Sequence, residues 1–212
     1  MIDLEPKKLP KQTRSKASFE AIIDASAQLL RASPYEALTT NHIAERAGVS
    51  IGTLYEFFPN KEAIIAALTA RLMKRLVENM QEAFIAASRL DAWNGVAHLT
   101  GQAVNAIAAD RVVFHVLLRQ ISFVQHLPVV EEARTAMTAL AQTIRVQAGD
   151  ALDLPMPEQD AWLIAQMLYN TILEIAFLDL GEDDRKRMTR ELARLVYRMA
   201  VGRDPDPDGP GL

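Results

Sequence analysis

Residues 38–62 have the sequence LTTNHIAERAGVSIGTLYEFFPNKE, which predicts two short helices joined by a tight turn. Thr39 or Thr40 can cap the first helix, because a side-chain hydroxyl accepts a hydrogen bond from a free backbone N–H of the first turn. Gly48 ends that helix, since glycine adopts the left-handed backbone of a helix end without a steric cost from Cβ. Ser50 can cap the second helix in the same way as the threonines.

The second helix has one apolar side and a sharp end. Leu54, Phe57 and Phe58 are spaced so that they can bury one side of it. Pro59 ends the helix, because proline disfavours helical geometry in the residue before it. Asn60 can then cap a further helix. These features are typical of a helix-turn-helix, the element that places a short helix in the major groove of DNA.

The polar residues of this segment favour contact with DNA over a purely structural role. Gly52, Thr53 and Tyr55 put a small residue, a hydroxyl and a phenol on a very short helix, and Lys61 stands at the start of the next helix. This set suits a close approach of the backbone and several phosphate contacts. Any helical hairpin that ends in glycine would share part of the pattern, but a core helix does not need the polar set.

Residues 16–68 resemble the DNA-binding domain of TetR-type transcriptional regulators. The chain departs from the usual pattern at Ser33 and Pro34, where a glycine commonly precedes the tyrosine, and at Leu30, where phenylalanine is common. Neither departure touches the residues expected to face DNA. The matching positions are Ile22, Ile23, Ala25, Leu29, Leu30, Tyr35, Leu38, Thr39, Thr40, Ile43, Ala44, Ala47, Gly48, Val49, Ser50, Gly52, Thr53, Leu54, Tyr55, Phe57, Phe58, Lys61 and Glu62.

The resemblance implies that the partner is a double-stranded DNA operator, which a symmetric dimer would contact at a palindromic site. It implies phosphate contacts from Thr40, Tyr55 and Lys61. The residues expected to face or adjoin base edges are Ser50, Ile51, Gly52, Thr53 and Glu56. A carboxylate such as Glu56 is tolerated near DNA mainly where it accepts a hydrogen bond from cytosine.

The composition favours helices and excludes several chemistries. The chain has 212 residues, of which 50% are hydrophobic and 24% charged, so one or two domains with a sizeable core are expected. It has no cysteine, which excludes disulfides, thiolate metal sites and cysteine nucleophiles. No apolar segment has the length of a signal peptide or a membrane span, so we expect a cytoplasmic protein without a membrane partner.

The charge is unevenly distributed along the chain. The net charge of −4 argues against nonspecific coating of nucleic acid. Basic residues nevertheless crowd the N-terminus, where two alternatives remain open: a solvated terminus, or an arm that contacts the DNA backbone or minor groove. These basic residues are Lys7, Lys8, Lys11, Arg14 and Lys16.

The predicted fold is all-α, with an N-terminal three-helix DNA-binding domain and a C-terminal helical bundle for ligand binding and dimerisation. Residues 1–15 form a flexible basic arm and residues 16–60 the helix-turn-helix domain. Residues 61–202 form the second domain, which a long helix from 60 to 88 enters, and residues 203–212 form an acidic, Pro- and Gly-rich tail that we interpret as disordered.

The last two helices predict a homodimer. The segment 157–180 is apolar over most of its circumference, and the following helix has one apolar face. An internal hairpin is the alternative, but this apolar area exceeds what a non-obligate surface carries. In the resembling family these two helices pair with those of a second copy as a four-helix bundle. The expected interface residues are Leu168, Ile172, Ile175, Leu192, Leu195 and Met199.

The expected effector site depends mainly on the resemblance. Helices between about 93 and 180 supply apolar walls with isolated polar groups, the usual composition of a pocket for a small, mostly hydrophobic molecule. Core packing is the alternative role for each residue taken singly. The candidates are Trp93, His98, Gln102, Asn105, Phe114, Leu118, Phe123, Trp162, Gln166 and Asn170. Glu174, between two apolar residues, is either a buried anchor for a cation or a carboxylate at the edge of an interface.

No catalytic, cofactor or metal motif is present in the sequence. His115 and His126 would be about 16 Å apart on one continuous helix, too far to share a metal ion. The sequence therefore predicts a ligand-responsive, dimeric transcriptional repressor. Two other functions stay open: a helical-bundle enzyme with an appended DNA-binding domain, and a DNA-binding adaptor whose C-terminal bundle binds a protein.

Overall fold

The computed structural model describes residues 3–148 and 157–205, and every regular element within these ranges is helical, which confirms the all-α prediction. The helices are α1 (Thr13–Ala32), η1 (Tyr35–Ala37), α2 (Thr40–Ala47), α3 (Ile51–Phe57), α4 (Lys61–Ala87), α5 (Ala92–Ala108), α6 (Arg111–His115), η2 (Val116–Gln120), η3 (Ser122–His126), α7 (Pro128–Ala148), α8 (Pro157–Phe177) and α9 (Glu182–Val201). The elements η1 and η3 are 3₁₀-helices and η2 is a π-helix.

The chain forms two compact units. The first contains the residues as far as Lys74 together with Val112–Glu131, and the second contains Arg75–Arg111 and the residues from Glu132 onward. The sequence instead placed a boundary at residue 60 and assigned all of 61–202 to one domain. Side-chain packing, which unites segments that are distant in sequence, produces this different grouping. The functional limits of the predicted domains stay a prediction.

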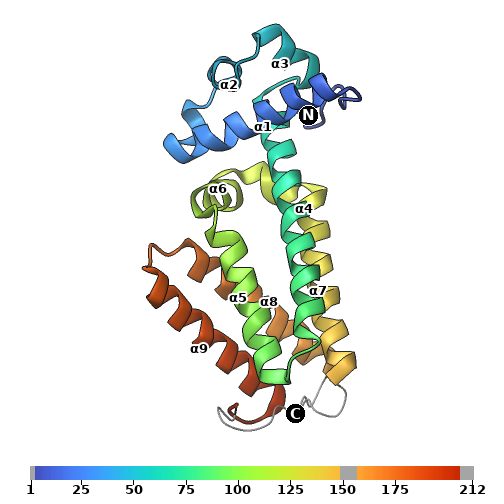
Figure 1. Cartoon of the computed structure of the whole chain (residues 1–212), viewed down its shortest axis with the longest axis vertical. Coiled ribbons are helices and arrows are strands. Elements are labelled where there is room, and N and C mark those ends of the chain that lie inside the picture. The colour runs from blue at the N-terminus through green and yellow to red at the C-terminus, as the bar shows by residue number, and fades with distance from the viewer. Residues whose placement is uncertain (1–2, 149–156, 206–212) are drawn as a thin grey trace. The chain divides into compact units, whose positions relative to one another are not determined.

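The first unit has an aromatic core beneath the helix-turn-helix. Helix α1 packs against α2 and α3 (Figure 1). The Phe19 ring of α1 stacks on Phe58 at 4.8 Å between ring centroids and meets Phe57 edge-on at 5.7 Å. Leu54, Phe57 and Phe58 are all buried, as their spacing predicted. Each such side chain contributes about 1.5–3 kcal/mol to folding through removal of apolar surface from water, so this cluster fixes α3 on its inner side.

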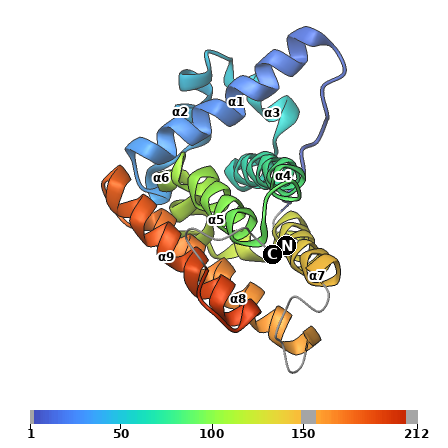
Figure 2. The same cartoon turned by 60° about the horizontal axis from the view of Figure 1, so that its bottom comes forward.

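The second unit is a bundle in which α5 packs against both α8 and α9, and α8 packs against α9 (Figures 1 and 2). Trp93 near the start of α5 meets the ring of Tyr197 edge-on at 5.9 Å between centroids. The Arg190 guanidinium lies 5.9 Å from the centroid of the same tryptophan ring. Trp93 thus joins α5 to α9.

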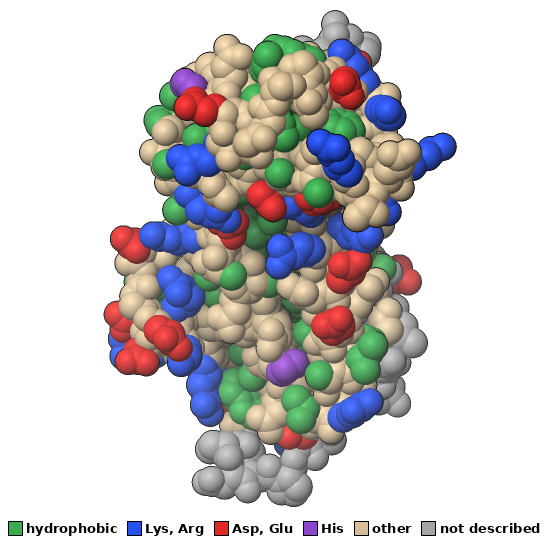
Figure 3. All heavy atoms as spheres, turned by 45° about the horizontal axis from the view of Figure 1, so that its top comes forward, with side chains coloured by type: hydrophobic (Ala, Val, Ile, Leu, Met, Phe, Trp, Pro, Cys, Tyr) green, Lys and Arg blue, Asp and Glu red, His purple; other side chains and the backbone are tan. Residues whose placement is uncertain are grey.

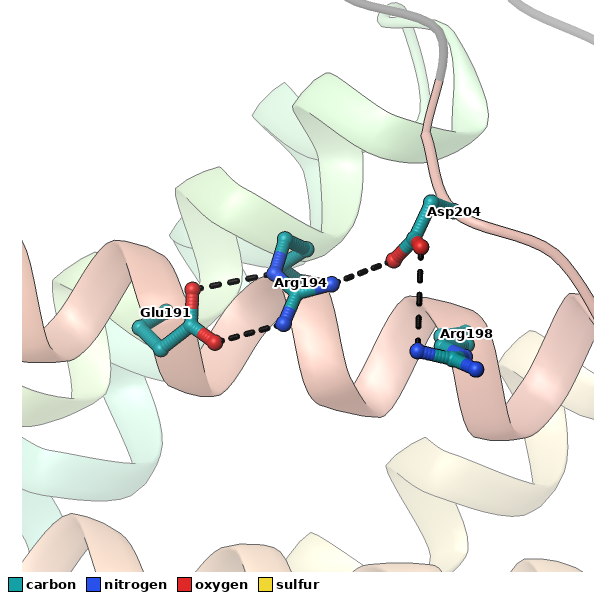
Figure 4. A network of polar contacts seen from close by, with 4 residues as sticks. All are labelled: Glu191, Arg194, Arg198 and Asp204. Carbon is teal, nitrogen blue, oxygen red and sulfur yellow. Dashed lines mark hydrogen bonds and ion pairs between the residues drawn. The ribbon is translucent and has the colours of Figure 1, made fainter.

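A network of ion pairs and hydrogen bonds lies near the C-terminal end of α9 (Figure 4). Arg194 forms two hydrogen bonds with the Glu191 carboxylate, at 2.9 and 2.6 Å. It also pairs with Asp204, whose other oxygen lies 3.7 Å from Arg198. Gly202, with φ of 76°, provides the left-handed residue that turns the chain back. The network therefore links Asp204 to the last turns of α9.

The apolar segment after α5 is not one continuous helix. Helix α6 ends at His115, a π-helical turn follows, and Ile121 takes an extended backbone with φ −103° and ψ 99°. The side chain of Gln125 donates to the Leu118 carbonyl at 3.1 Å and stabilises this break. His115 and His126 consequently lie on different elements. Among the described residues, no three potential ligands gather into a group that could hold a metal ion.

Candidate nucleic-acid interface

Helices α2 and α3 each begin at a side-chain cap, and a left-handed glycine ends α2 at the turn between them. Thr39 accepts a hydrogen bond from the His42 backbone N–H at 3.2 Å, so the first of the two possible threonine caps is the one used. Gly48 has the left-handed backbone, with φ of 67°, that the sequence predicted. Ser50 accepts from the Thr53 backbone N–H at 3.0 Å. These caps set the direction in which α3 leaves the turn.

Two hydroxyl groups meet on the surface of the helix-turn-helix. The Thr40 Oγ1 atom on α2 lies 3.1 Å from the Tyr55 hydroxyl oxygen on α3, and Tyr55 is 42% exposed. In such a pair one hydroxyl donates to the other, which leaves one O–H to donate outward. Phosphate oxygens are acceptors of this kind of donor. The two hydroxyl groups together thus leave one O–H that can donate to a partner outside the chain.

Lys61, the first residue of α4, combines a structural contact with unused donors. Its ammonium group donates to the Leu38 carbonyl at 3.2 Å and lies 4.3 Å from the centroid of the Tyr35 ring. An ammonium group has three N–H donors, so this single hydrogen bond leaves capacity for an anion. Tyr35 in turn donates to Glu62 at 3.3 Å. Burial and the negative charge of Glu62 raise the pKa of Tyr35, which keeps the phenol protonated.

The outer side of α3 is open to solvent. Ile51 is 38% exposed, and Gly52 and Glu56 are exposed as well. Thr53 is half-buried, and its hydroxyl lies 2.9 Å from that of Ser50. A Cβ atom on Gly52 would meet only the Ser50 hydroxyl, at an ordinary contact distance of 3.7 Å. The fold itself therefore does not require glycine at this position, and the missing side chain leaves backbone open to an approaching partner.

Charge is mixed on the face of the molecule that Figure 3 draws. Figure 3 shows Lys and Arg side chains interspersed with Asp and Glu on the face drawn, among the residues that the structure describes. The net charge of the chain is −4. A net negative charge does not provide a general attraction to an anionic partner, so any such attraction would depend on a few positioned donors.

The N-terminal arm contacts α3, which sequence reasoning missed. The Lys7 backbone N–H donates to the Phe57 carbonyl at 2.8 Å, and its ammonium group donates to the Tyr55 carbonyl at 3.2 Å. The Asn60 side chain donates to the Asp3 carbonyl at 2.9 Å. The basic composition of the arm was the only sequence signal. The acceptors are backbone carbonyls, which no sequence spacing identifies.

The candidate effector residues do not share one unit. Phe114, Leu118 and Phe123 belong to the first unit, and the other seven belong to the second. Phe114 is buried, whereas Trp162 is 51% exposed. Three candidates with polar side chains are also exposed: Gln102, Asn105 and Asn170. His98 and Gln166 are half-buried. The effector site stays a prediction, and Trp93 has a packing role against Tyr197 as described above.

The candidate interface residues of α8 and α9 fall into two groups. Ile172 and Ile175 are buried within the single chain, and Leu168 and Leu192 are half-buried. Leu195 and Met199 are 44% and 43% exposed. Other exposed apolar residues, which the expected interface did not include, are Trp162, Leu163 and Met167 on α8, Leu178 directly after α8, and Met188 on α9. The apolar circumference of α8 thus serves the chain's own core on one side and remains exposed on the other.

Glu174 belongs to the exposed side of α8. Glu174 is exposed, and it lies seven positions after the exposed Met167, which places the two on one face of α8. This position does not favour a buried anchor for a cation. It agrees with a carboxylate beside an interface.

In the part of the chain that the structure describes, no helix is both long and apolar enough to span a bilayer.

Residues 22–68 match the sequence model of the bacterial regulatory proteins of the tetR family. The fatty acid metabolism regulator protein of Bacillus subtilis (strain 168) is 38% identical over 72 residues, which cover 34% of this chain and 36% of that protein. The repressor KstR of Rhodococcus jostii (strain RHA1) is 40% identical over 55 residues, which cover 26% of each chain. The match thus spans only about a third or a quarter of these relatives' own length.

Solved structures resemble the chain over a much greater length. The fatty acid degradation regulator FadR from Bacillus halodurans has a TM-score of 0.69 at 22% identity, covering 89% of this chain and 97% of that one. The regulator FadR from Bacillus subtilis, solved in complex with stearoyl-CoA, has a TM-score of 0.66 at 24% identity, covering 87% and 99%. These likenesses show that the chain has the fold of such proteins well beyond residues 22–68.

Proposed function

We propose that this chain, a TetR-type regulator by its DNA-binding domain and its fold, is a ligand-responsive transcriptional repressor. It binds a palindromic operator as a homodimer and leaves it when a small, mostly hydrophobic molecule binds. The observation that carries this proposal is the geometry of the helix-turn-helix, where capped helices hold Thr40 and Tyr55 hydroxyl groups 3.1 Å apart on an exposed surface. The protein acts by binding, in the cytoplasm, and not by catalysis.

Some residues of the interface position the protein on DNA, and others recognise the base sequence. Thr40, Tyr55 and Lys61 contact phosphates, which sets the depth and orientation of α3 in the major groove. The residues that face or adjoin base edges are Ser50, Ile51, Gly52, Thr53 and Glu56. All of them except the half-buried Thr53 are exposed on the outer side of α3 or at its N-terminal cap, which supports this role, because direct readout requires side chains that reach the groove. Phosphate contacts then supply much of the affinity, and the base contacts supply the selectivity.

The exposed apolar side chains of α8 and α9 support the dimer. Met188, Leu192, Leu195 and Met199 lie at the helical spacing i, i+4, i+7 and i+11 and form one stripe on α9. Three of these four residues are exposed by 40% or more. A stripe of this kind is costly to leave in water, and a second copy of the same chain covers it with an equivalent stripe. Two half-sites on DNA follow from that symmetry.

The relatives give a first class of effector to test. FadR from Bacillus subtilis was solved with stearoyl-CoA, whose long acyl chain is a large apolar group. A long-chain acyl-CoA is therefore the first probe for this chain. An effector acts only if it prefers a conformation that binds the operator less well. The long helix α4, which joins the DNA-binding residues to the rest of the chain, provides a covalent path for such a change.

The proposal is tested by selecting DNA fragments on the purified full chain. A palindromic consensus should emerge, and fluorescence anisotropy should show that the selected site is bound more tightly than a scrambled duplex of equal length. Equal affinity for the selected and scrambled duplexes at every salt concentration would contradict the proposed function. Turnover of a bound small molecule would instead favour a helical-bundle enzyme.

A further inference from the structure

The C-terminal end of α3 leaves backbone carbonyls that the helix cannot satisfy. The helix has only seven residues, and the last carbonyls of any helix lack an intrahelical donor. The Leu54 carbonyl is still served by the N–H of Phe58, at 2.9 Å. The donor for Tyr55 would be the residue four positions later, which is Pro59, and proline has no N–H. The carbonyl of Tyr55 consequently has no donor within the helix and can accept from water or from another part of the chain.

Lys7 supplies that donor and a second one. Its ammonium group donates to the Tyr55 carbonyl at 3.2 Å, and its backbone N–H donates to the Phe57 carbonyl at 2.8 Å. A positive charge at this position also complements the negative end of the helix dipole. Lys7 thus donates to the Tyr55 carbonyl, to which residue 59 would donate if it were not proline.

A second attachment joins the same arm to the start of α4. The Asn60 side-chain oxygen accepts from the Ala63 backbone N–H at 2.8 Å and so caps α4. The nitrogen of the same amide donates to the Asp3 carbonyl at 2.9 Å. The arm is therefore held at Asp3 and at Lys7, on both sides of the short connection between α3 and α4.

We propose that Lys7 is a positioning residue for the DNA-binding helix, and that Asp3–Lys7 form a brace for α3 and not a flexible tether. The inference rests on the proposed function. Its link to DNA is Tyr55, whose carbonyl accepts from Lys7 and whose hydroxyl meets Thr40 at 3.1 Å. Lys7 fixes the backbone from which the phosphate-contacting phenol extends. Its ammonium group donates to the Tyr55 carbonyl, and we assign this charge to the helix end and not to a phosphate.

The matched variants are Lys7→Met, Lys8→Met and Lys11→Met, which each remove one positive charge from the arm. Lys8 and Lys11 are exposed. We expect Lys7→Met to lower operator affinity about two- to fivefold, the range for a lost charge at a helix terminus. The slope of log affinity against log salt should stay unchanged, because no phosphate contact is lost. Lys7→Arg, which keeps a cationic donor, should restore most of the affinity.

Two outcomes of the binding series would overturn the brace. One is a Lys7→Met variant with unaltered operator affinity. The other is a salt slope that falls by about 1, as it does when a phosphate contact is removed. Equal losses in Lys7→Met and Lys8→Met with equal changes of slope would likewise show that Lys7 acts only through its charge.

A measurement without DNA separates this inference from the proposed function. Hydrogen–deuterium exchange of the free full chain should show a protected Lys7 amide, since that N–H donates to Phe57, and Lys8 provides the comparison in the same arm. Rapid exchange of the Lys7 amide would overturn the brace even if the operator is bound. If the Lys7 amide is protected but the chain binds no operator, the proposed function is contradicted. The contact between Lys7 and α3 would then exist without a role in DNA binding.

Discussion

The hydroxyl groups of Thr40 and Tyr55 lie 3.1 Å apart and join the first residue of α2 to the exposed side of α3. The contact couples the two helices that a helix-turn-helix must hold at a fixed angle. It also leaves one outward O–H for an acceptor. The pair is thus both a link within the fold and a donor for DNA, and its two roles can be separated by substitution.

Removing the two hydroxyl groups should give non-additive losses of operator affinity. Tyr55→Phe should cost about 1.5–3 kcal/mol, the range for a hydrogen bond to a charged group. Thr40→Val in the Tyr55→Phe background should cost less than Thr40→Val alone, because the residues are in direct contact. Anisotropy titrations of the four proteins of this double-mutant cycle measure the coupling. Strictly additive losses would show that the two hydroxyls do not act together on DNA.

Replacing Lys61 should change the salt dependence of operator binding. Lys61→Met keeps an unbranched side chain but removes the ammonium group, which lies 4.3 Å from the centroid of the Tyr35 ring. We expect weaker binding to all sequences and a salt slope reduced by about 1, as for a lost phosphate contact. Lys11→Met is the control, since Lys11 is an exposed arm lysine outside the predicted DNA-contacting set. An unchanged slope in Lys61→Met would assign Lys61 to the Leu38 contact alone.

Adding a methyl group to Gly52 should separate stability from DNA binding. Gly52→Ala meets no close contact within the chain, so it should raise the free energy of unfolding by up to about 1 kcal/mol. It should nevertheless lower operator affinity, because the added Cβ occupies the surface that approaches DNA. Gly101→Ala in α5 is the matched control, as its Cβ would also enter open space. Urea unfolding and anisotropy measure the two effects. Undiminished operator affinity in Gly52→Ala would exclude close approach at this position.

A charge on the exposed stripe of α9 should separate the dimer. Leu195→Arg places the charge at a position that is 44% exposed in the single chain. It should produce folded monomers with greatly reduced operator affinity, because burying an unpaired charge in an apolar interface is costly. Leu90→Arg is the control at a leucine of 47% exposure outside α8 and α9. Sedimentation gives the oligomeric state, and a monomeric unaltered chain at micromolar concentration would contradict the dimer.

Ile175 is unsuitable for the same experiment. It is only 3% exposed within one chain, so an arginine there would disrupt the core of the second unit whether or not a dimer forms. A loss of assembly in Ile175→Arg would therefore not distinguish an interface from a folding defect.

Effector and operator should weaken each other's binding by the same factor. A coupling of about 1–3 kcal/mol lowers operator affinity roughly 5–150-fold at saturating effector, and linkage requires an equal loss of effector affinity on the operator complex. Stearoyl-CoA is the first probe, and coenzyme A without an acyl chain tests whether the apolar part is needed. Stearoyl-CoA that binds without changing operator affinity is not the inducer. The same result for every ligand that binds would contradict the switch.

The sequence alone determined the helix-turn-helix and its caps. Thr39, Gly48 and Ser50 act on backbone groups within a few residues of themselves, so their effect follows from local spacing. The burial of Phe57 and Phe58 follows from the helical period and the position of Pro59. The residues expected to face DNA were instead named from the resemblance of residues 16–68 to TetR-type regulators.

Only the tertiary structure decided which long-range partner each group has. Lys7 and Tyr55 are 48 residues apart, and their contact depends on how the arm returns to α3. The apolar period of α8 could not separate Ile172, which is buried in the chain, from Met167, which is exposed. The hydrophobic effect is non-directional, so burial of an apolar side chain is favourable on either side of a helix, whichever apolar group covers it. Which side faces the chain's own core is therefore set by the packing of α5 and α9 against α8, and not by the sequence of α8 itself.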